Sequence, residues 1–165
     1  MLIYIKRAAV FLFLSFFSAT CGFYVLQWLM GFVFGGYFRM HNYHEVQPLG
    51  FILICSIWYT FIALGLSKIF LRATTLGRIG LTLIISILTV LLSSPFGGML
   101  YLYYDMASGS LQSNWYDVML VKGTTWGLEL GWLIVAYSFP YNVLGMIACY
   151  FITLIGSKVP PPEIE

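Results

Sequence analysis

Four long apolar runs, separated by short polar stretches, organise this chain. They cover residues 8–34, 49–70, 79–104 and 126–156, and almost every charged residue lies outside them. An α-helix needs about 20 apolar residues to cross the hydrocarbon core of a membrane. The pattern therefore predicts an all-α membrane protein, a four-transmembrane-helix bundle that forms a single domain over residues 1–165.

Composition agrees with this interpretation. Hydrophobic residues make up 61% of the 165 residues and charged residues only 8%, whereas soluble domains carry about 25% charged residues. The length leaves no room for a second globular unit. The net charge of +2 is too small to indicate a nucleic-acid partner. We therefore expect the lipid bilayer to be the main partner, with no direct contact to nucleic acid.

The basic residues predict how the bundle is oriented. With the N-terminus inside, six of them fall on the cytoplasmic side and only Arg39 and Lys122 on the outer side. Cytoplasmic loops of membrane proteins carry such an excess of Lys and Arg. We expect a multi-pass protein of the cell inner (plasma) membrane with both termini in the cytoplasm. The start of the chain resembles a signal peptide, but its apolar run continues past Cys21, which favours an uncleaved first span.

The two outer connections are predicted to differ. Residues 36–48 form a short polar loop, whereas residues 105–125 contain a helical pattern. Apolar side chains recur there on one helical face, at Leu111, Trp115, Val118 and Met119. We expect a short amphipathic helix that lies on the outer membrane surface or caps the bundle. Residues 157–165 form a cytoplasmic tail.

Glu129 is the one acid inside a predicted span. Carboxylates within membranes are costly and are often functional, so Glu129 is a possible functional acid that couples proton or cation transport. It also lies about one turn after the predicted start of the fourth span. There it would be near the interface, at the positive end of the helix dipole, and could pair with Lys122 or Arg39. The interfacial interpretation is favoured.

The weak metal candidates are His41, His44 and Glu45, which are close enough in sequence to bind a divalent ion. Their order differs from the His-Glu-x-x-His signature, and a further ligand would have to come from Asp105 or Asp117. A solvated loop is the simpler interpretation. We expect no metal, no cofactor and no catalytic residue.

Cysteine chemistry is not expected either. The three cysteines lie within apolar runs, and their spacing predicts buried small residues rather than disulfides.

Small residues on the third and fourth runs predict helix packing. Gly127 and Gly131 are four residues apart, and Ser93 and Gly97 have the same spacing on the third run. Such pairs allow helices to approach closely, but they leave open whether the partner helix belongs to the same chain or to another copy. In the tail, Pro160, Pro161 and Pro162 favour polyproline II, either as a frayed end or as a binding segment for a cytosolic protein.

The sequence contains no phosphate-binding loop, no Ser/His/Asp arrangement and no two-cysteine motif. We therefore expect a protein that is not an enzyme: a non-catalytic integral membrane subunit that forms a homo-oligomer and anchors or signals to a cytosolic partner. One alternative is an oligomeric ion pore or small-solute transporter. The other is a membrane enzyme with a metal site on its outer face.

In size, number of spans and sparse cytoplasmic surface, the chain resembles the small four-span subunits that bacteria pair with a cytosolic effector. The Kiwa anti-phage defence system contains such a subunit. The resemblance implies a scaffold or envelope sensor in antiviral defence. It is a likeness of layout, and it assigns a role to no individual residue.

Overall fold

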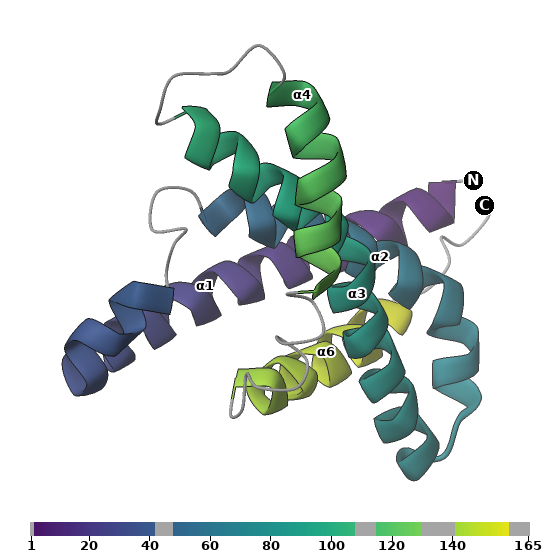
Figure 1. Cartoon of the computed structure of the whole chain (residues 1–165). Helices are drawn as coiled ribbons and strands as arrows, with labels where there is room; N and C mark the ends of the chain where they lie inside the picture. The colour runs from purple at the N-terminus through teal and green to yellow at the C-terminus, as the bar shows by residue number, and fades with distance from the viewer. Residues whose placement is uncertain (1, 42–47, 108–114, 130–140, 159–165) are drawn as a thin grey trace.

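The computed structural model of the chain describes residues 2–41, 48–107, 115–129 and 141–158 (Figure 1). The described residues are almost all helical, with no strand among them. A tight turn at residues 73–74 joins the second and third long helices. The elements are α1 (Leu2–His41), α2 (Pro48–Arg72), α3 (Thr75–Ala107), α4 (Trp115–Val118), the π-helix η1 (Met119–Gly123) and α6 (Tyr141–Ser157). The all-α prediction is confirmed for this part of the chain.

Three of the described helices are long and apolar enough to cross a membrane. The segments are Tyr4–Val25 in α1, Leu49–Arg72 in α2 and Thr75–Tyr104 in α3. Large apolar side chains such as Phe13 and Phe61 are exposed on their surfaces. Exposed apolar patches of this extent suit a bilayer rather than water.

The predicted fourth span, 126–156, is only partly described. Residues 124–129 are helical, α6 begins at Tyr141, and residues 130–140 lie outside the described residues. The apolar part of α6, Val143–Ser157, is shorter than the three long segments. A fourth crossing therefore stays a prediction.

The predicted first outer loop is shorter than the sequence pattern indicates. The prediction began this loop at residue 36, but α1 remains helical to His41. A glycine inside a helix costs only about 1 kcal/mol, so the Gly35–Gly36 pair does not have to end one. The next helix, α2, starts at Pro48, where the missing N–H of proline has no helical partner to lose.

One helical stretch crosses the predicted boundary, near residue 125, between a surface helix and the fourth span. Helical structure runs without a break from Trp115 to Glu129, through α4, η1 and residues 124–129. We refer to this stretch as the 115–129 helix. It packs along α3 instead of forming a separate short helix, and Figure 1 shows it beside the second half of α3.

The core lies where α1, α2, α3 and α6 meet. Its buried residues are Phe11, Tyr59, Ala63, Ile85 and Ile152. The Tyr59 ring packs edge-on against Phe11, with ring centroids 6.3 Å apart. A phenol buried among helices needs hydrogen-bond partners. The Tyr59 hydroxyl has two on α6: it lies 2.8 Å from the Thr153 hydroxyl and donates to the Cys149 carbonyl at 3.2 Å.

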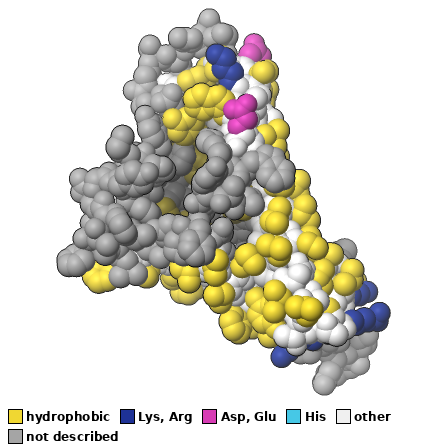
Figure 2. Space-filling model, turned by 60° about the horizontal axis from the view of Figure 1, so that its bottom comes forward, with side chains coloured by type: hydrophobic (Ala, Val, Ile, Leu, Met, Phe, Trp, Pro, Cys, Tyr) yellow, Lys and Arg dark blue, Asp and Glu magenta, His cyan; other side chains and the backbone are white. Residues whose placement is uncertain are grey.

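Charge is distributed unevenly between the two ends of the bundle. On the face drawn in Figure 2, most Lys and Arg side chains gather at one end and the acidic side chains at the other. Two contacts show which helix ends meet at the basic end. The Phe11 ring of α1 lies against Gly156 of α6, and the Phe70 ring of α2 lies 5.8 Å from Tyr150. This arrangement agrees with the predicted basic side, while the membrane and the sidedness stay predictions.

Candidate functional site

Backbone lies directly against backbone at three glycines in the contact between α3 and the 115–129 helix. A β-carbon on Gly98 would lie 2.6 Å from the Gly127 nitrogen, and one on Gly123 would lie 2.8 Å from the Met99 α-carbon. A β-carbon on Gly127 would lie 2.9 Å from the Pro95 α-carbon. Glycine is required at these positions because any side chain would occupy the space of the neighbouring main chain.

Two threonines in this polar stretch bond to carbonyls of their own helix. The Thr124 hydroxyl donates to the Leu120 carbonyl at 2.5 Å, and the Thr125 hydroxyl donates to the Val121 carbonyl at 2.9 Å. These carbonyls belong to the π-helical turn η1, whose wider hydrogen-bonding pattern departs from the α-helical one. Threonine side chains commonly bond to the carbonyl four residues earlier. The polar residues therefore bond within the helix instead of ending it.

The 115–129 helix runs antiparallel to α3, and this register places Glu129 beside the middle part of α3. Because Gly123 lies beside Met99, and Gly127 beside Pro95, Glu129 is level with Leu92 and its neighbours. The apolar segment Thr75–Tyr104 has its midpoint about three residues away, which is about 5 Å at 1.5 Å per residue. The prediction that Glu129 lies near the interface counted from a helix start at residue 126. The helix starts at Trp115.

Glu129 belongs to a polar stripe on the exposed side of the 115–129 helix. Lys122, Thr125 and Glu129 are spaced by three and four residues, which places them on one helical face, and all three are exposed. We refer to these three residues as the polar stripe. The buried glycines Gly123 and Gly127 lie on the side that faces α3. The stripe thus carries both a base and an acid on a surface turned away from α3.

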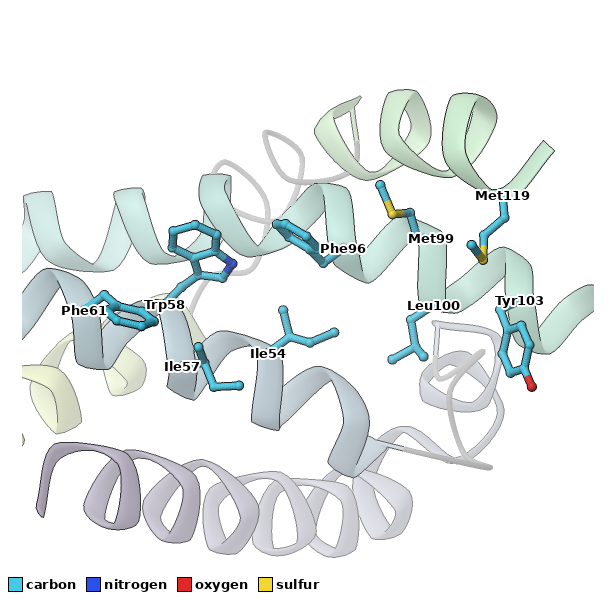
Figure 3. Close-up of a pocket in the computed structure, with 9 residues that line it drawn as sticks. All are labelled: Ile54, Ile57, Trp58, Phe61, Phe96, Met99, Leu100, Tyr103 and Met119. Atoms are coloured by element: carbon cyan, nitrogen blue, oxygen red, sulfur yellow. The ribbon is translucent and has the colours of Figure 1, made fainter. Parts of the chain in front are cut away.

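An apolar groove of about 470 Å³ lies between α2, α3 and η1 (Figure 3). Figure 3 shows Phe61 at one end of the groove and Tyr103 and Met119 at the other. Its remaining lining residues are Ile54, Ile57, Trp58, Phe96, Met99 and Leu100. A surface of this chemistry suits a lipid tail or the apolar side chains of another helix, and offers few groups for a polar solute.

The predicted packing residues lie at contacts within the chain. Ser93 accepts a bond from the Cys55 thiol of α2 at 3.3 Å, and a β-carbon on Gly97 would lie 3.1 Å from the Phe51 ring. Gly127 packs on α3, and Gly131 lies outside the described residues. The described members of this set therefore offer no free small-residue face to a second copy.

The metal candidates are mostly outside the described range. His41 is the last residue of α1, while His44 and Glu45 fall in residues 42–47, which the structure does not describe. Within the described ranges, no three His, Cys, Asp or Glu side chains gather in a way that could hold a metal ion. The proline segment, Pro160, Pro161 and Pro162, also lies outside these ranges.

Two residues of the site were missed by sequence reasoning, Gly98 and Gly123. The available signal was the spacing of Gly123 and Gly127, a second pair four residues apart that precedes the pair singled out in the sequence.

Comparison with known proteins gave no relative. A scan against protein-family models, a search of curated proteins and a search of solved structures each found no match. The proposals below therefore rest on the residues and geometry of this chain.

Proposed function

We propose that the protein is a non-catalytic subunit of a membrane complex, which binds a second protein within the bilayer and anchors or signals to a cytosolic partner. The observation that carries the proposal is the position of Glu129. Its side chain is exposed and level with the middle of the apolar α3 segment.

An exposed carboxyl group near the middle of a membrane needs a polar or charged interaction partner. Ionisable side chains near the bilayer centre are costly, and they pair with one another, face water-filled cavities or belong to ion pathways. Glutamate is too short to reach the interface, because half of a hydrocarbon core is about 15 Å thick. A neighbouring membrane protein would provide a polar partner for Glu129, and this favours a subunit over an isolated bundle.

The basic end supports a cytosolic contact. Lys68, Arg72 and Lys158 are exposed there, and the connection between α2 and α3 is a tight turn. The described part of this surface is small. It suits an anchor that presents positive charge to an acidic surface of a soluble protein.

The test is native mass spectrometry of the tagged chain, extracted in mild detergent from membranes of its own host. We expect a complex in which this chain is accompanied by another protein at fixed stoichiometry. The same analysis of a Glu129→Leu variant should show less complex, while Leu83→Ala, which alters an exposed side chain of α3, should not. A wild-type chain that is monomeric under all mild conditions would contradict the proposal.

A second candidate function is proton or cation transport, and the depth of Glu129 favours it as well. Reconstituted liposomes with a pH-sensitive dye inside would test this function. Flux through the wild type that is lost in Glu129→Gln would establish transport and remove the non-catalytic subunit as the main function.

The role of envelope sensor in anti-phage defence stays a prediction from the layout of the chain. Phage infection of three host strains tests this role: one with the wild-type gene, one without the gene, and one with the Glu129→Leu variant. The variant strain shows whether defence depends on Glu129. Equal plaque numbers in all three strains would count against defence without affecting the proposed assembly.

A further inference from the structure

We propose that the polar stripe is a docking surface for a transmembrane helix of a different protein. That helix carries a basic residue at the depth of Glu129 and an acidic residue at the depth of Lys122, about two turns closer to the end where α3 finishes. The inference rests on the proposed function and names the chemistry of its partner.

The stripe cannot be neutralised along its own helix. Lys122 and Glu129 are seven residues apart, so their α-carbons are separated by about 10 Å along the axis. Ion pairs along a helix form between residues three or four apart. The intervening Thr125 hydroxyl is already bonded to the Val121 carbonyl, so it does not bridge the two charges.

The stripe also points away from the nearest helix. The 115–129 helix meets α3 through Gly123 and Gly127, whose added β-carbons would touch the α3 main chain. Glu129 follows Gly127 by two residues, a rotation of about 200° around the helix. The acid therefore lies on the opposite side from α3, where a neighbouring molecule can reach it.

A second copy of the chain is a poor match for this surface. Copies in one membrane share an orientation, so a closed ring has its axis along the membrane normal and brings equal residues to equal depth. At a two-fold contact through the stripe, Glu129 would face Glu129 and Lys122 would face Lys122. Like charges at close range are unfavourable, especially where water is excluded.

A ring in which the stripe meets another face of the next copy is no better. The Cys55–Ser93 hydrogen bond shows that α2 near residue 55 is level with Glu129. The side chains exposed on α2 and α3 near this depth include Leu53, Ile57 and Leu92. At the depth of Glu129 these described faces offer hydrocarbon to the carboxylate, whereas a different protein can supply a base there and an acid at the depth of Lys122.

Apolar neighbours make the stripe suitable for a helix. Val121 and Leu128 are exposed beside it. A helix that pairs its charges with the stripe would also cover these side chains. Charge pairs of this kind determine which partner binds and in which register, because a shift by one turn separates both pairs.

The experiment places a photo-crosslinking phenylalanine analogue at Thr125 of the tagged full chain, in membranes of its own host. Leu83, exposed on α3, is the control position. We expect irradiation to give an adduct with another membrane protein from position 125 and at least ten-fold less of it from position 83. Sequencing of the crosslinked peptide should show a transmembrane segment with a basic and an acidic residue about seven positions apart.

Charge variants then decide the chemistry. Glu129→Gln and Lys122→Met should each reduce the adduct several-fold, and Glu129→Lys should abolish it. Replacement of the partner's basic residue by Glu should restore the adduct with Glu129→Lys. Unchanged thermal unfolding of the Gln and Met variants shows that the bundle is intact. A different protein captured equally well by all variants would overturn the inference.

Other outcomes separate the inference from the proposed function. An adduct with a second copy of this chain overturns the inference and leaves a membrane subunit that self-associates. Adducts with lipid alone, together with a complex in native mass spectrometry, also overturn the docking surface but keep the subunit. Adducts with lipid alone and a monomer in native mass spectrometry overturn both.

Discussion

Gly98 of α3 and Gly127 of the 115–129 helix face each other so closely that a β-carbon on Gly98 would lie 2.6 Å from the Gly127 nitrogen. The clash would be with backbone, which cannot rotate away as a flexible side chain can. We predict that Gly98→Ala destabilises the bundle by about 1–3 kcal/mol, as overpacking does in other proteins.

Thermal unfolding in detergent measures this effect. Gly145→Ala in α6 is the matched control, because a β-carbon there has no neighbour within 4 Å. We expect a clearly lower midpoint for Gly98→Ala and a midpoint near the wild type for the control. Equal midpoints for the two variants would show that the two helices can separate at no cost.

The contact between Phe11 and Gly156 should behave differently, because the atom in the way belongs to a side chain. A β-carbon on Gly156 would lie 2.7 Å from Cδ1 of the fully buried Phe11 ring. We predict that Gly156→Ala destabilises the packing of α1 on α6, and that Phe11→Leu added to it recovers part of the loss.

This prediction depends on non-additivity. Phe11→Leu alone removes buried ring atoms and should also destabilise the protein. If the two substitutions act through one contact, the double variant will be more stable than the sum of the single effects predicts. Strict additivity in unfolding midpoints would mean that the ring and Gly156 do not share that space.

The Tyr59 hydroxyl links α2 to α6, and its removal should cost a measurable but modest amount. It is 2.8 Å from the Thr153 hydroxyl and 3.2 Å from the Cys149 carbonyl. Hydrogen bonds between helices in membranes contribute about 0.6 kcal/mol on average and up to about 1.7. We expect Tyr59→Phe to lose an amount in this range.

A double-mutant cycle with Thr153→Val isolates the pair. The single variants and the double variant should show a coupling energy above about 0.5 kcal/mol in detergent unfolding. Tyr24→Phe, which alters an exposed tyrosine of α1, serves as the control and should be neutral. A coupling of zero would indicate that the two hydroxyls find other partners.

Arg78 closes the turn between α2 and α3. Its guanidinium donates from Nε to the Phe70 carbonyl at 3.1 Å and from Nη2 to the Leu71 carbonyl at 3.0 Å. These carbonyls are in the last turn of α2, where positive charge is favourable. We predict that Arg78→Gln lowers stability by about 1 kcal/mol, since the amide cannot reproduce both charge-assisted bonds.

The exposed Arg72 provides the comparison. Arg72→Gln removes the same charge from the same end of the bundle, so a shared effect on membrane insertion would alter both variants equally. A lower unfolding midpoint for Arg78→Gln alone would identify the hydrogen bonds as the cause. Identical behaviour of the two variants would assign the effect to charge.

Orientation can be tested with fusions at each end of the chain. The contact between Phe11 and Gly156 places the start of α1 and the end of α6 at one end of the bundle. With the basic end in the cytoplasm, a fluorescent protein should be bright at either terminus and a secreted phosphatase inactive at either. An active phosphatase fusion at one terminus only would require an odd number of crossings.

Apolar runs were sufficient to predict α2 and α3, because few polar residues interrupt either run. They were not sufficient for the 115–129 helix. Its polar residues Lys122, Thr124 and Thr125 look like a loop in sequence, but the two threonines bond to carbonyls of their own helix. The position of Glu129 beside the middle part of α3 could not be predicted for the same reason, since it depends on how far the 115–129 helix extends, and the interfacial location of Glu129 stays a prediction.

The glycine contacts show a second limit of prediction from sequence. A small-residue spacing indicates that two helices approach closely, but it does not say which two. Gly97 and Ser93 face α2, whereas Gly98, one residue further along, faces the 115–129 helix. Only the pairing of helices in three dimensions separates these neighbouring positions.

The contact between α1 and α6 has a consequence for biogenesis. Gly156 is translated 145 residues after Phe11, so α1 is synthesised long before its partner helix exists. Until then the aromatic ring that fills this contact faces lipid or an insertion factor. A nascent chain that stalls between α1 and α6 therefore leaves the α6-facing side of the Phe11 ring uncovered, wherever in that interval it stops.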